Sequence, residues 1–396
     1  MKYLRKFEHI EDFNQFVESG LIERPNVSYI VEGNIVNYFP QISPSFIVLD
    51  QTIDDPYSMI TGDINGKHLQ LIRNNCHRYL GKNTGEGVMT ICQLDDTNSL
   101  LYVDGTTADL TGNDGDVFMK LPRFAYKAEE IEDDKWKIGF VYGDAIDSTW
   151  KQWQGDELIG VYKGVNIDSK LYSHSDVFGS TGSQSLITTC AHNRGEGFSA
   201  TKLKHHNILA FLFYAMYGNT NSQAIVGVGT GSQKQSGQTN ALGMCDTSAD
   251  TNGNLQSINF LGLENWWGDT YEWLDNITVN YYSWDITEDD GTTRRVVAPS
   301  INSGHISKIH VGENLDVIPK EANSSQTTGF CDLYYAISST GKAVCRGGSA
   351  NSLDGGIACV NAYTSATSGS RAGRLAFRGI IKEEKNVEAF KSLTVI

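Results

Sequence analysis

The ten residues ILAFLFYAMY, from Ile208 to Tyr217, constrain the fold more than any other part of the sequence. They belong to a helix that we expect from about Thr201 to Tyr217, and apolar side chains surround its later turns on nearly every side. A helix without a polar face must be covered by the rest of the protein. The run is too short to cross a bilayer, which takes about 20 residues. We therefore expect a buried helix inside a globular protein.

Outside this helix the chain reads as many short strands. The sequence has 40 Gly among 396 residues, and after about residue 106 Gly, Ser, Thr and Asn divide it into short apolar stretches. One further helix is expected from about Gly182 to Asn193, where Ser and Thr can cap free backbone amides. The pattern predicts one long domain over residues 106–383, followed by a tail over residues 384–396.

Two smaller regions precede this domain. Residues 1–50 combine a short charged opening helix with SYIVEGNIVNYF, which indicates a hairpin that turns at Gly33-Asn34. We interpret residues 1–50 as an attachment and oligomerisation segment. Residues 51–105 contain the strand-like pieces HLQLI, GVMTICQL and SLLYVDG, and we expect them to form a small strand-rich module.

Charge and cysteine content exclude several classes of protein. Lys and Arg number 32 against 47 Asp and Glu, so the net charge of -15 repels a phosphate backbone and argues against nucleic acid as a partner. The seven cysteines are scattered and form no CxxC pair, which predicts buried thiols rather than a disulfide framework or a zinc site. The basic start lacks an apolar stretch, so we expect synthesis in the cytoplasm and no membrane insertion.

No motif predicts a catalytic residue or a cofactor site. GVGTGS, residues 227–232, lacks the GK[ST] ending and the strand-to-helix context of a phosphate-binding loop, so we interpret it as a tight surface turn. The sequence also lacks the GxSxG motif that would place a nucleophilic serine on a sharp turn. We therefore expect a protein that is not an enzyme.

The residues that could bind a metal ion also lack a suitable arrangement. His205 and His206 project about 100° apart on a helix and cannot share a ligand face, so we expect them in packing or surface positions. The acidic groups at 54–55, 95–96 and 288–290 do not follow the ligand spacing of an EF-hand and are expected in solvated turns. No metal site is predicted.

An aromatic segment, LGLENWWGDTYEWLDNI from Leu261 to Ile277, gathers three tryptophans among several carboxylates. We interpret Trp266 and Trp273 as core residues whose indole N–H groups bond to neighbouring polar side chains. Stacking of a sugar on an aromatic ring of this segment is the alternative.

Four segments resemble, in order, the elements of a known fold. GEGFSATKLKHHNILAFLFYAMYGN, GDTYEWLDN, KAVCRGGSA and GRLAFRG are similar to the helix, the GNVWEW-like element, the RGGSW-like element and the GFR ending of the C-type lectin fold of the formylglycine-generating-enzyme type. The loops YGNTNSQAI, GLENWWGD and GSRAGRLAFRG look closer to the variable proteins of diversity-generating retroelements in phages and gut Bacteroides. The resemblance implies an α+β fold, in which a compact C-type-lectin-like domain has short, mostly antiparallel strands and two flanking helices.

The sequence departs from the oxidising enzymes of this fold. Their catalytic cysteines follow the GGS element at positions that are Ser352 and Ile357 here, and the nearby thiol is Cys359. This departure argues against formylglycine-generating activity. A carbohydrate-binding lectin-like module and an iron- or copper-dependent oxidase relative remain as alternatives.

The resemblance also gives a reading of residues 350–371. Copying errors at template adenines can turn AAC codons into NNC codons, which do not encode Lys, Glu, Gln, Met or Trp, and all five are absent from these residues. A loop of small residues is the alternative explanation. We expect Ala358, Val360 and Ala362 to belong to a strand-like scaffold. The predicted exposed ligand contacts are Asn351, Leu353, Asp354, Tyr363, Thr364, Ser365, Ser370 and Arg371.

These features together predict a receptor-binding protein with a hypervariable C-terminal segment. Its expected partner is a host cell-surface protein or glycan. The expected place is a phage tail tip after synthesis in the cytoplasm, with the cytoplasm or a cell surface as alternatives. A small variable surface binds weakly, so we expect a homo-oligomer, for example a trimer, assembled through residues 1–50.

Overall fold

Two compact units make up the chain, Met1–Pro44 and Ser45–Ile396. The structure is a computed structural model, and the residues that it describes are 6–7, 27–31, 34–38, 43–230, 233–247, 256–280, 283–297, 303–336, 342–348, 355–362 and 366–395. The larger unit is a mixed α+β fold with mostly antiparallel strands in several sheets and few helices, which confirms the coarse fold class.

The smaller unit contains a β-hairpin. Strands β2 (Val27–Val31) and β3 (Asn34–Tyr38) pair antiparallel with Val31 opposite Asn34, as the sequence predicted. Strand β1 (Lys6–Phe7) pairs parallel with β2, so these two residues form a strand and not part of the expected opening helix. The other residues of that helix lie outside the described residues.

The larger unit begins with strand β4 (Ser45–Asp50), which lies inside a five-stranded sheet of order β11-β9-β10-β4-β5. The other strands are β5 (Ile60–Gly62), β9 (Phe124–Glu132), β10 (Lys135–Tyr142) and β11 (Lys151–Trp153). Helix α2 (Lys67–Asn74) packs against β10, and His68 of α2 accepts a hydrogen bond from the backbone N–H of Tyr142 at 3.0 Å.

A seven-stranded sheet of order β15-β27-β12-β8-β6-β7-β28 joins strands from distant parts of the sequence. Its strands are β6 (His77–Gly85), β7 (Val88–Gln93), β8 (Asp116–Lys120), β12 (Glu157–Gly160), β15 (Phe198–Ala200), β27 (Leu375–Arg378) and β28 (Ile380–Glu383). All neighbours are antiparallel except β28 and β7, which are parallel. Residues near the C-terminal end thus complete a sheet that begins near residue 77.

A second seven-stranded sheet has the order β20-β19-β18-β25-β26-β24-β21. Its strands are β18 (Glu272–Asn280), β19 (Ser283–Thr287), β20 (Thr293–Val297), β21 (Gly304–His305), β24 (Leu333–Tyr335), β25 (Lys342–Arg346) and β26 (Val360–Asn361). The two-stranded sheets are β13 (Val165–Ile167) with β14 (Lys170–Tyr172), β16 (Asn259–Phe260) with β17 (Leu263–Glu264), and β22 (Lys308–His310) with β23 (Ile318–Glu321).

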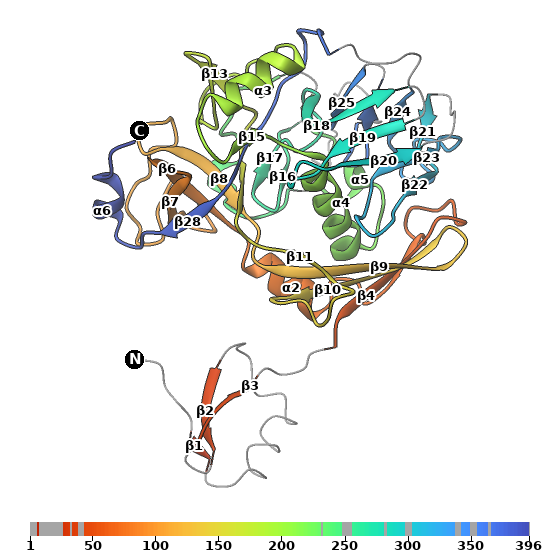
Figure 1. The fold of residues 1–396 in the computed structure, drawn as a ribbon, viewed down its shortest axis with the longest axis horizontal. Coiled ribbons are helices and arrows are strands. Elements are labelled where there is room, and N and C mark those ends of the chain that lie inside the picture. Colours follow the sequence, from red (N-terminus) through yellow and green to blue (C-terminus); the bar gives the residue numbers. More distant parts are fainter. Residues whose placement is uncertain are drawn as a thin grey trace. The chain divides into compact units, whose positions relative to one another are not determined.

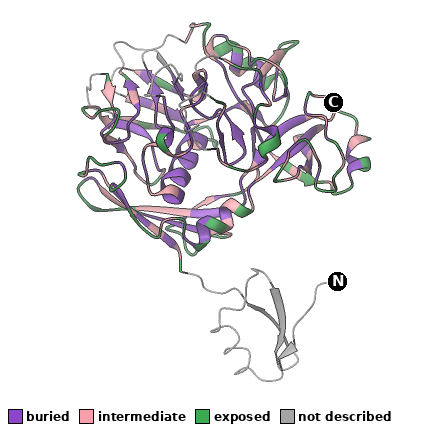
Figure 2. Cartoon of the chain, turned by 180° about the vertical axis from the view of Figure 1, so that it is seen from behind, coloured by how far each residue is buried: buried purple, intermediate pink, exposed green. Residues whose placement is uncertain are grey.

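Helix α4 (Leu203–Tyr217) occupies the centre of the larger unit, between the five-stranded sheet and the second seven-stranded sheet (Figure 1). Of its 15 residues 13 are buried, which confirms the expected buried helix. Gly218 ends the helix in the left-handed region at φ 61°, where its N–H donates to the carbonyl of Tyr214 at 2.9 Å. Buried residues, purple in Figure 2, follow α4 and the strands around it.

The other helices are short. Helix α3 (Gln184–His192) confirms the second expected helix, and the hydroxyl of Ser183 caps it by accepting from the N–H of Leu186 at 3.2 Å. Among the described residues, the remaining helical elements are α5 (Ser222–Ile225), the 3₁₀ turn η1 (Asn240–Leu242) and α6 (Val387–Lys391). The sequence predicted α3 and α4 in this unit but did not predict α2, α5, η1 or α6.

Three local interpretations of the sequence were wrong. HLQLI lies in α2, where His68, Leu69 and Ile72 are buried with helical spacing. SLLYVDG forms only isolated bridges at Leu101 and Tyr102, whereas GVMTICQL does contain a strand, β7. The described part of GVGTGS, residues 227–230, is largely buried and contacts the backbone at Gly268, so it is not a surface turn.

Candidate functional site

The C-terminal segment, residues 346–379, is held at both ends by one buried carboxylate. Glu272 of β18 is 1% exposed. Nη2 of Arg346 donates to Oε2 of Glu272 at 2.6 Å, and Nη2 of Arg374 donates to Oε1 of Glu272 at 2.8 Å. Nζ of Lys163 donates to the same Oε1 at 2.9 Å. GDTYEW, RGGS and GRLAFR therefore meet at one set of charges, which we call the Glu272 cluster.

The electrostatics of the Glu272 cluster favour the ionised carboxylate. Burial alone would raise the pKa of Glu272, but the three neighbouring cations, Arg346 foremost, hold it well below its ordinary value. Burial lowers the pKa of Arg346 to about 9, although Glu272 opposes this effect. The guanidinium carbon of Arg346 also lies 3.2 Å from the ring centroid of Trp266. Moving either arginine away from Glu272 would leave an uncompensated buried charge, which is energetically costly. The cluster therefore fixes the two ends of the segment.

The middle of the segment, residues 355–362, is anchored through its backbone. The carboxylate of Asp332 accepts hydrogen bonds from the N–H groups of Gly356 and Ala358, each at 2.7 Å. The N–H between them donates to the hydroxyl of Ser222 at 2.9 Å. These bonds satisfy consecutive buried donors with side chains that lie outside the segment. These anchoring hydrogen bonds therefore do not involve side chains of the segment itself.

The expected scaffold residues are buried. Ala358, Val360 and Ala362 are each 0% exposed, which confirms their prediction as part of the scaffold. Strand β26 pairs antiparallel with β25 and parallel with β24, so it lies inside the second seven-stranded sheet.

Two glycines bring together the ends that flank residues 349–354. Gly348 has φ 54°, and a Cβ added to it would lie 2.5 Å from the Cα of Gly355. Larger residues would meet both backbone strain and a steric clash at this position. The neighbouring Gly347 donates to the carbonyl of Cys359 at 3.0 Å and accepts from the N–H of Gly268 at 2.8 Å. Gly348 and Gly355, the described residues on either side of 349–354, therefore lie close together, and Gly347 and Gly348 are buried.

The last part of the segment runs beside helix α3 and strand β18. The N–H of Gly182 donates to the carbonyl of Arg371 at 2.9 Å, and the N–H of Trp273 donates to the carbonyl of Ala372 at 3.0 Å. Ser370 is exposed, and its hydroxyl lies 2.9 Å from Nη1 of Arg371. The guanidinium carbon of Arg371 lies 4.8 Å from the ring centroid of Tyr271. The backbone here is fixed while polar side chains remain accessible.

The structure places only part of the predicted contact set. Ser370 and Arg371 are adjacent and at least partly exposed. The other six predicted contacts lie outside the described residues, and they are Asn351, Leu353, Asp354, Tyr363, Thr364 and Ser365. The prediction for those six therefore stays a prediction.

Three residues near the segment were missed in the sequence. Tyr271 is half-buried beneath Arg371. Leu186 is 45% exposed and would contact a side chain placed at Gly182, which bonds to Arg371. Tyr335 is 36% exposed, and its carbonyl accepts from the N–H of Ala362 at 3.0 Å. These residues come from α3, from the position just before β18 and from β24, so only the fold brings them beside the segment.

Trp266 and Trp273 of the aromatic segment are core residues, as the sequence predicted, and so is Trp267. Trp266, Trp267 and Trp273 are at most 1% exposed, so none of them can present a face to a sugar. The indole N–H of Trp267 donates to the carbonyl of Gly227 at 2.9 Å, and that of Trp273 donates to the carbonyl of Gly182 at 2.8 Å. These partners are backbone groups and not the expected side chains. Nε1 of Trp266 has no hydrogen-bond partner among the described residues.

The candidate metal ligands do not converge. Within the described ranges, no group of three or more His, Cys, Asp or Glu side chains is arranged to hold a metal ion. His205 and His206 are both buried, which confirms packing positions, and Nε2 of His205 lies 2.8 Å from Oε2 of Glu157. All seven cysteines are free, and six are buried, but Cys245 is exposed, contrary to the expectation of buried thiols. Cys359 and Ile357 are each 1% exposed, and Ser352 lies outside the described residues.

Comparison of the chain with protein-family profiles and with curated proteins finds no match. In the part of the chain that the structure describes, no helix combines the length and the apolar character needed to cross a membrane.

Proposed function

We propose that this chain is a binding protein that presents its C-terminal segment to a protein or glycan on a host cell surface. It is a variable protein of the diversity-generating retroelement type with a C-type-lectin-like fold, displayed on a phage tail or a cell surface. The four ordered motifs support this family, and the convergence of the last three on Glu272 gives those three a common structural role.

The observation that carries the proposal is the anchoring of the C-terminal segment. Buried groups fix its backbone, namely the Glu272 cluster, Asp332 and Gly348. Ser370 and Arg371, by contrast, are at least partly exposed beside residues from other elements. A backbone fixed by surrounding residues tolerates changes in the exposed side chains, which is the condition for a variable recognition surface. Arg371 on the ring of Tyr271 offers a positioned cation, and Leu186 offers nearby apolar area.

Such a surface binds weakly as a single copy. About eight mostly small side chains bury less than the roughly 800 Å² per partner of a standard interface. Micromolar affinity is therefore expected for one copy, and linked copies raise avidity by roughly 10²–10⁴. We propose that the unit Met1–Pro44 supplies the assembly. Sedimentation of the full chain against a chain beginning at Ser45 tests this, since a full-length monomer at tens of micromolar would refute it.

The gene provides the sharpest test. Active diversification requires a near-identical second copy of the codons for residues 350–371, differing almost only at template adenines, beside a reverse transcriptase. Sequencing of the neighbouring DNA reveals both. If neither is present, active diversification is wrong, and the proposal is reduced to binding by a fixed surface.

Binding to cells provides the second test. The full chain, displayed in several copies on fluorescent beads, is added to a panel of gut bacterial strains, and bound fluorescence is measured. Arg371→Ala should lower binding to any recognised strain, while Lys385→Ala, which changes an exposed cation outside the segment, should not. Equal binding by both variants would remove Arg371 from the recognition surface. Stoichiometric iron or copper in the purified protein would instead favour the oxidase alternative.

A further inference from the structure

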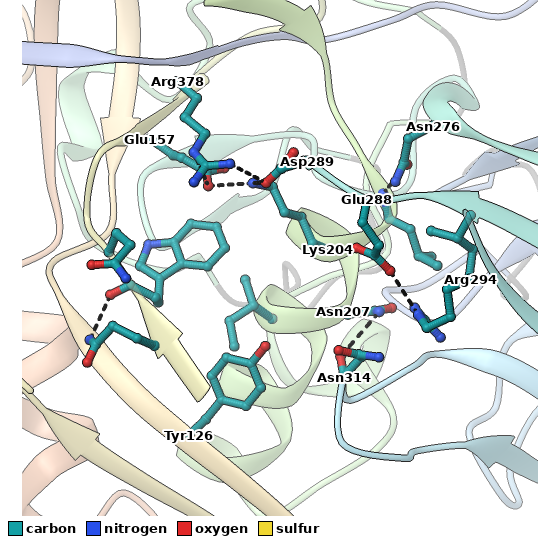
Figure 3. A pocket seen from close by; sticks show the side chains of 16 residues that line it. Tyr126, Glu157, Lys204, Asn207, Asn276, Glu288, Asp289, Arg294, Asn314 and Arg378 are labelled. Carbon is teal, nitrogen blue, oxygen red and sulfur yellow. Dashed lines mark hydrogen bonds and ion pairs between the residues drawn. The ribbon is translucent and has the colours of Figure 1, made fainter. Parts of the chain in front are cut away.

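A polar pocket of 160 Å³ lies where the five-stranded sheet meets the start of α4 (Figure 3), and none of its lining residues belongs to 349–371. Strands β9 and β11 supply Tyr126 and Trp153, and α4 supplies Lys204 and Asn207. Its inner wall is buried, since Trp153 is 7% and Asn207 3% exposed, whereas Arg378 at its edge is exposed. All of its lining residues belong to the described part of the chain.

The charges that line the pocket compensate one another. Lys204 bridges the carboxylates of Glu157 and Asp289. Nη1 of Arg378 lies 2.7 Å from Oδ2 of Asp289. On the opposite side, Nε of Arg294 donates to Glu288 at 2.8 Å (Figure 3). The lining contains as many cations as carboxylates, so a charged ligand would find no unpaired counter-ion there.

Uncharged polar groups at the pocket do have free hydrogen-bonding capacity. The hydroxyl of Tyr126 points into the pocket, and no described residue forms a hydrogen bond with it (Figure 3). Burial, together with the nearby carboxylate of Asp316, raises the pKa of Tyr126, so the hydroxyl keeps its proton and can both donate and accept. The amide of Asn314 uses its oxygen to accept from Lys151 at 2.7 Å, which leaves its N–H₂ group available.

The indole of Trp153 contributes an aromatic surface to the pocket rather than a hydrogen-bond donor. Its Nε1 is buried and has no hydrogen-bond partner among the described residues. The same side chain gives the pocket an aromatic wall next to polar groups, which is how proteins contact the apolar face of a molecule whose edge carries hydroxyls.

The size of the pocket limits the ligand. A group of the size of a water molecule needs about 10–15 Å³ of such a cavity. The 160 Å³ of the pocket therefore accommodates roughly ten to sixteen such groups. One sugar ring with its hydroxyls has this size. A disaccharide or a nucleotide would have to extend past Arg378 into solvent.

We propose that this pocket binds an uncharged, hydroxyl-rich molecule of the size of one sugar ring, either a free monosaccharide or the terminal residue of a neutral glycan. Paired charges around the pocket disfavour anions and cations, whereas Tyr126 and Asn314 offer hydrogen bonds to hydroxyl groups and Trp153 offers an aromatic surface. The inference is independent of the proposed role of the C-terminal segment, because Arg378 alone connects the two sites.

The test uses the full chain and saturation-transfer NMR with glucose, galactose, mannose and N-acetylglucosamine, with N-acetylneuraminic acid and glucosamine as charged probes. At least one neutral sugar should bind, and the charged probes should bind more weakly. Tyr126→Phe should weaken neutral-sugar binding by about 3- to 10-fold, the effect of losing one hydrogen bond. The control Tyr57→Phe removes the hydroxyl of a tyrosine that is 62% exposed and outside the pocket, and should bind like the parent.

Three results would overturn the proposal. They are no neutral sugar bound at tens of millimolar, a charged probe bound more tightly than every neutral sugar, and unchanged binding by both Tyr126→Phe and Asn314→Ala. Asn314→Ala also replaces Tyr126→Phe if the latter fails to fold, as judged by its melting curve. An array of immobilised neutral glycans, used in parallel, distinguishes a terminal glycan residue from a free monosaccharide.

Discussion

Replacement of Glu272 by Gln tests whether the Glu272 cluster holds the two ends of the C-terminal segment in place. Gln has nearly the same size as Glu but no charge, so Glu272→Gln leaves Lys163, Arg346 and Arg374 facing one another in a buried site. Removal of one partner from a buried ion pair costs about 3–5 kcal/mol of unfolding free energy. For a unit of about 350 residues, an unfolding entropy of about 2.1 cal/mol/K per residue converts this loss into a fall of roughly 4–7 °C in Tm.

The pH dependence of this effect follows from the lowered pKa of Glu272. The ordinary value for a glutamate is 4.5, and the folded protein holds the carboxyl below it. The stabilisation is therefore fully present above about pH 4.5 and is lost as the pH falls further towards the folded pKa. Differential scanning calorimetry should show a constant gap between the parent and Glu272→Gln from pH 6 to 8, and a shrinking gap below pH 4.5.

An exposed ion pair provides the matched control. Asp144 accepts from Nε of Arg123 at 2.6 Å, and the two side chains are 79% and 47% exposed. Asp144→Asn should cost at most about 1 kcal/mol, because solvent screens such pairs. If Glu272→Gln lowers Tm no more than Asp144→Asn does, the Glu272 cluster does not clamp the segment and the reasoning fails.

Two further predictions concern the core and the surface. Phe213→Ala should cost about 3–5 kcal/mol in urea denaturation because Phe213 is 0% exposed, whereas Arg371→Ala should cost about 0.5 kcal/mol or less. A large loss for Arg371→Ala would mark that side chain as structural. Burial holds the pKa of His206 well below its ordinary value of 6.5. Below pH 6.5 this histidine is therefore protonated in the unfolded chain but neutral in the folded protein. The unfolding free energy then falls by up to about 1.4 kcal/mol for each pH unit. His206→Leu should flatten this slope between pH 6.5 and 5.5, and an unchanged slope would contradict the assignment to His206.

Local features of the sequence predicted the helices that depend on local patterns. The apolar run in α4 and the serine cap of α3 each belong to one short stretch, so both helices were found within two residues of their ends. Helix α2 was missed because Leu69 and Leu71 alternate with polar residues as in a strand, whereas burial follows His68, Leu69 and Ile72. In α2 the helical contacts of the folded unit override the local alternation.

The candidate site depends on contacts that no local pattern encodes. Glu272, Arg346 and Arg374 are far apart in the sequence, and each reads as an ordinary charged residue until the strands pair. The scaffold role of Ala358, Val360 and Ala362 was predictable because these apolar residues stand at every second position, as in a strand. Tyr271 and Leu186 were not predictable, since their position beside Arg371 results from long-range packing of β18 and α3.

The place of β27 has a consequence for synthesis of the protein. This strand lies between β15 and β12, and it follows the C-terminal segment in the chain. The first seven-stranded sheet therefore stays incomplete until the residues after the segment have left the ribosome. A chain that stops within the segment lacks Arg374 and β27, and it leaves β12 and β15 with unpaired edges that favour aggregation. Cellular quality control would thus remove truncated products, and the segment would persist only on complete chains.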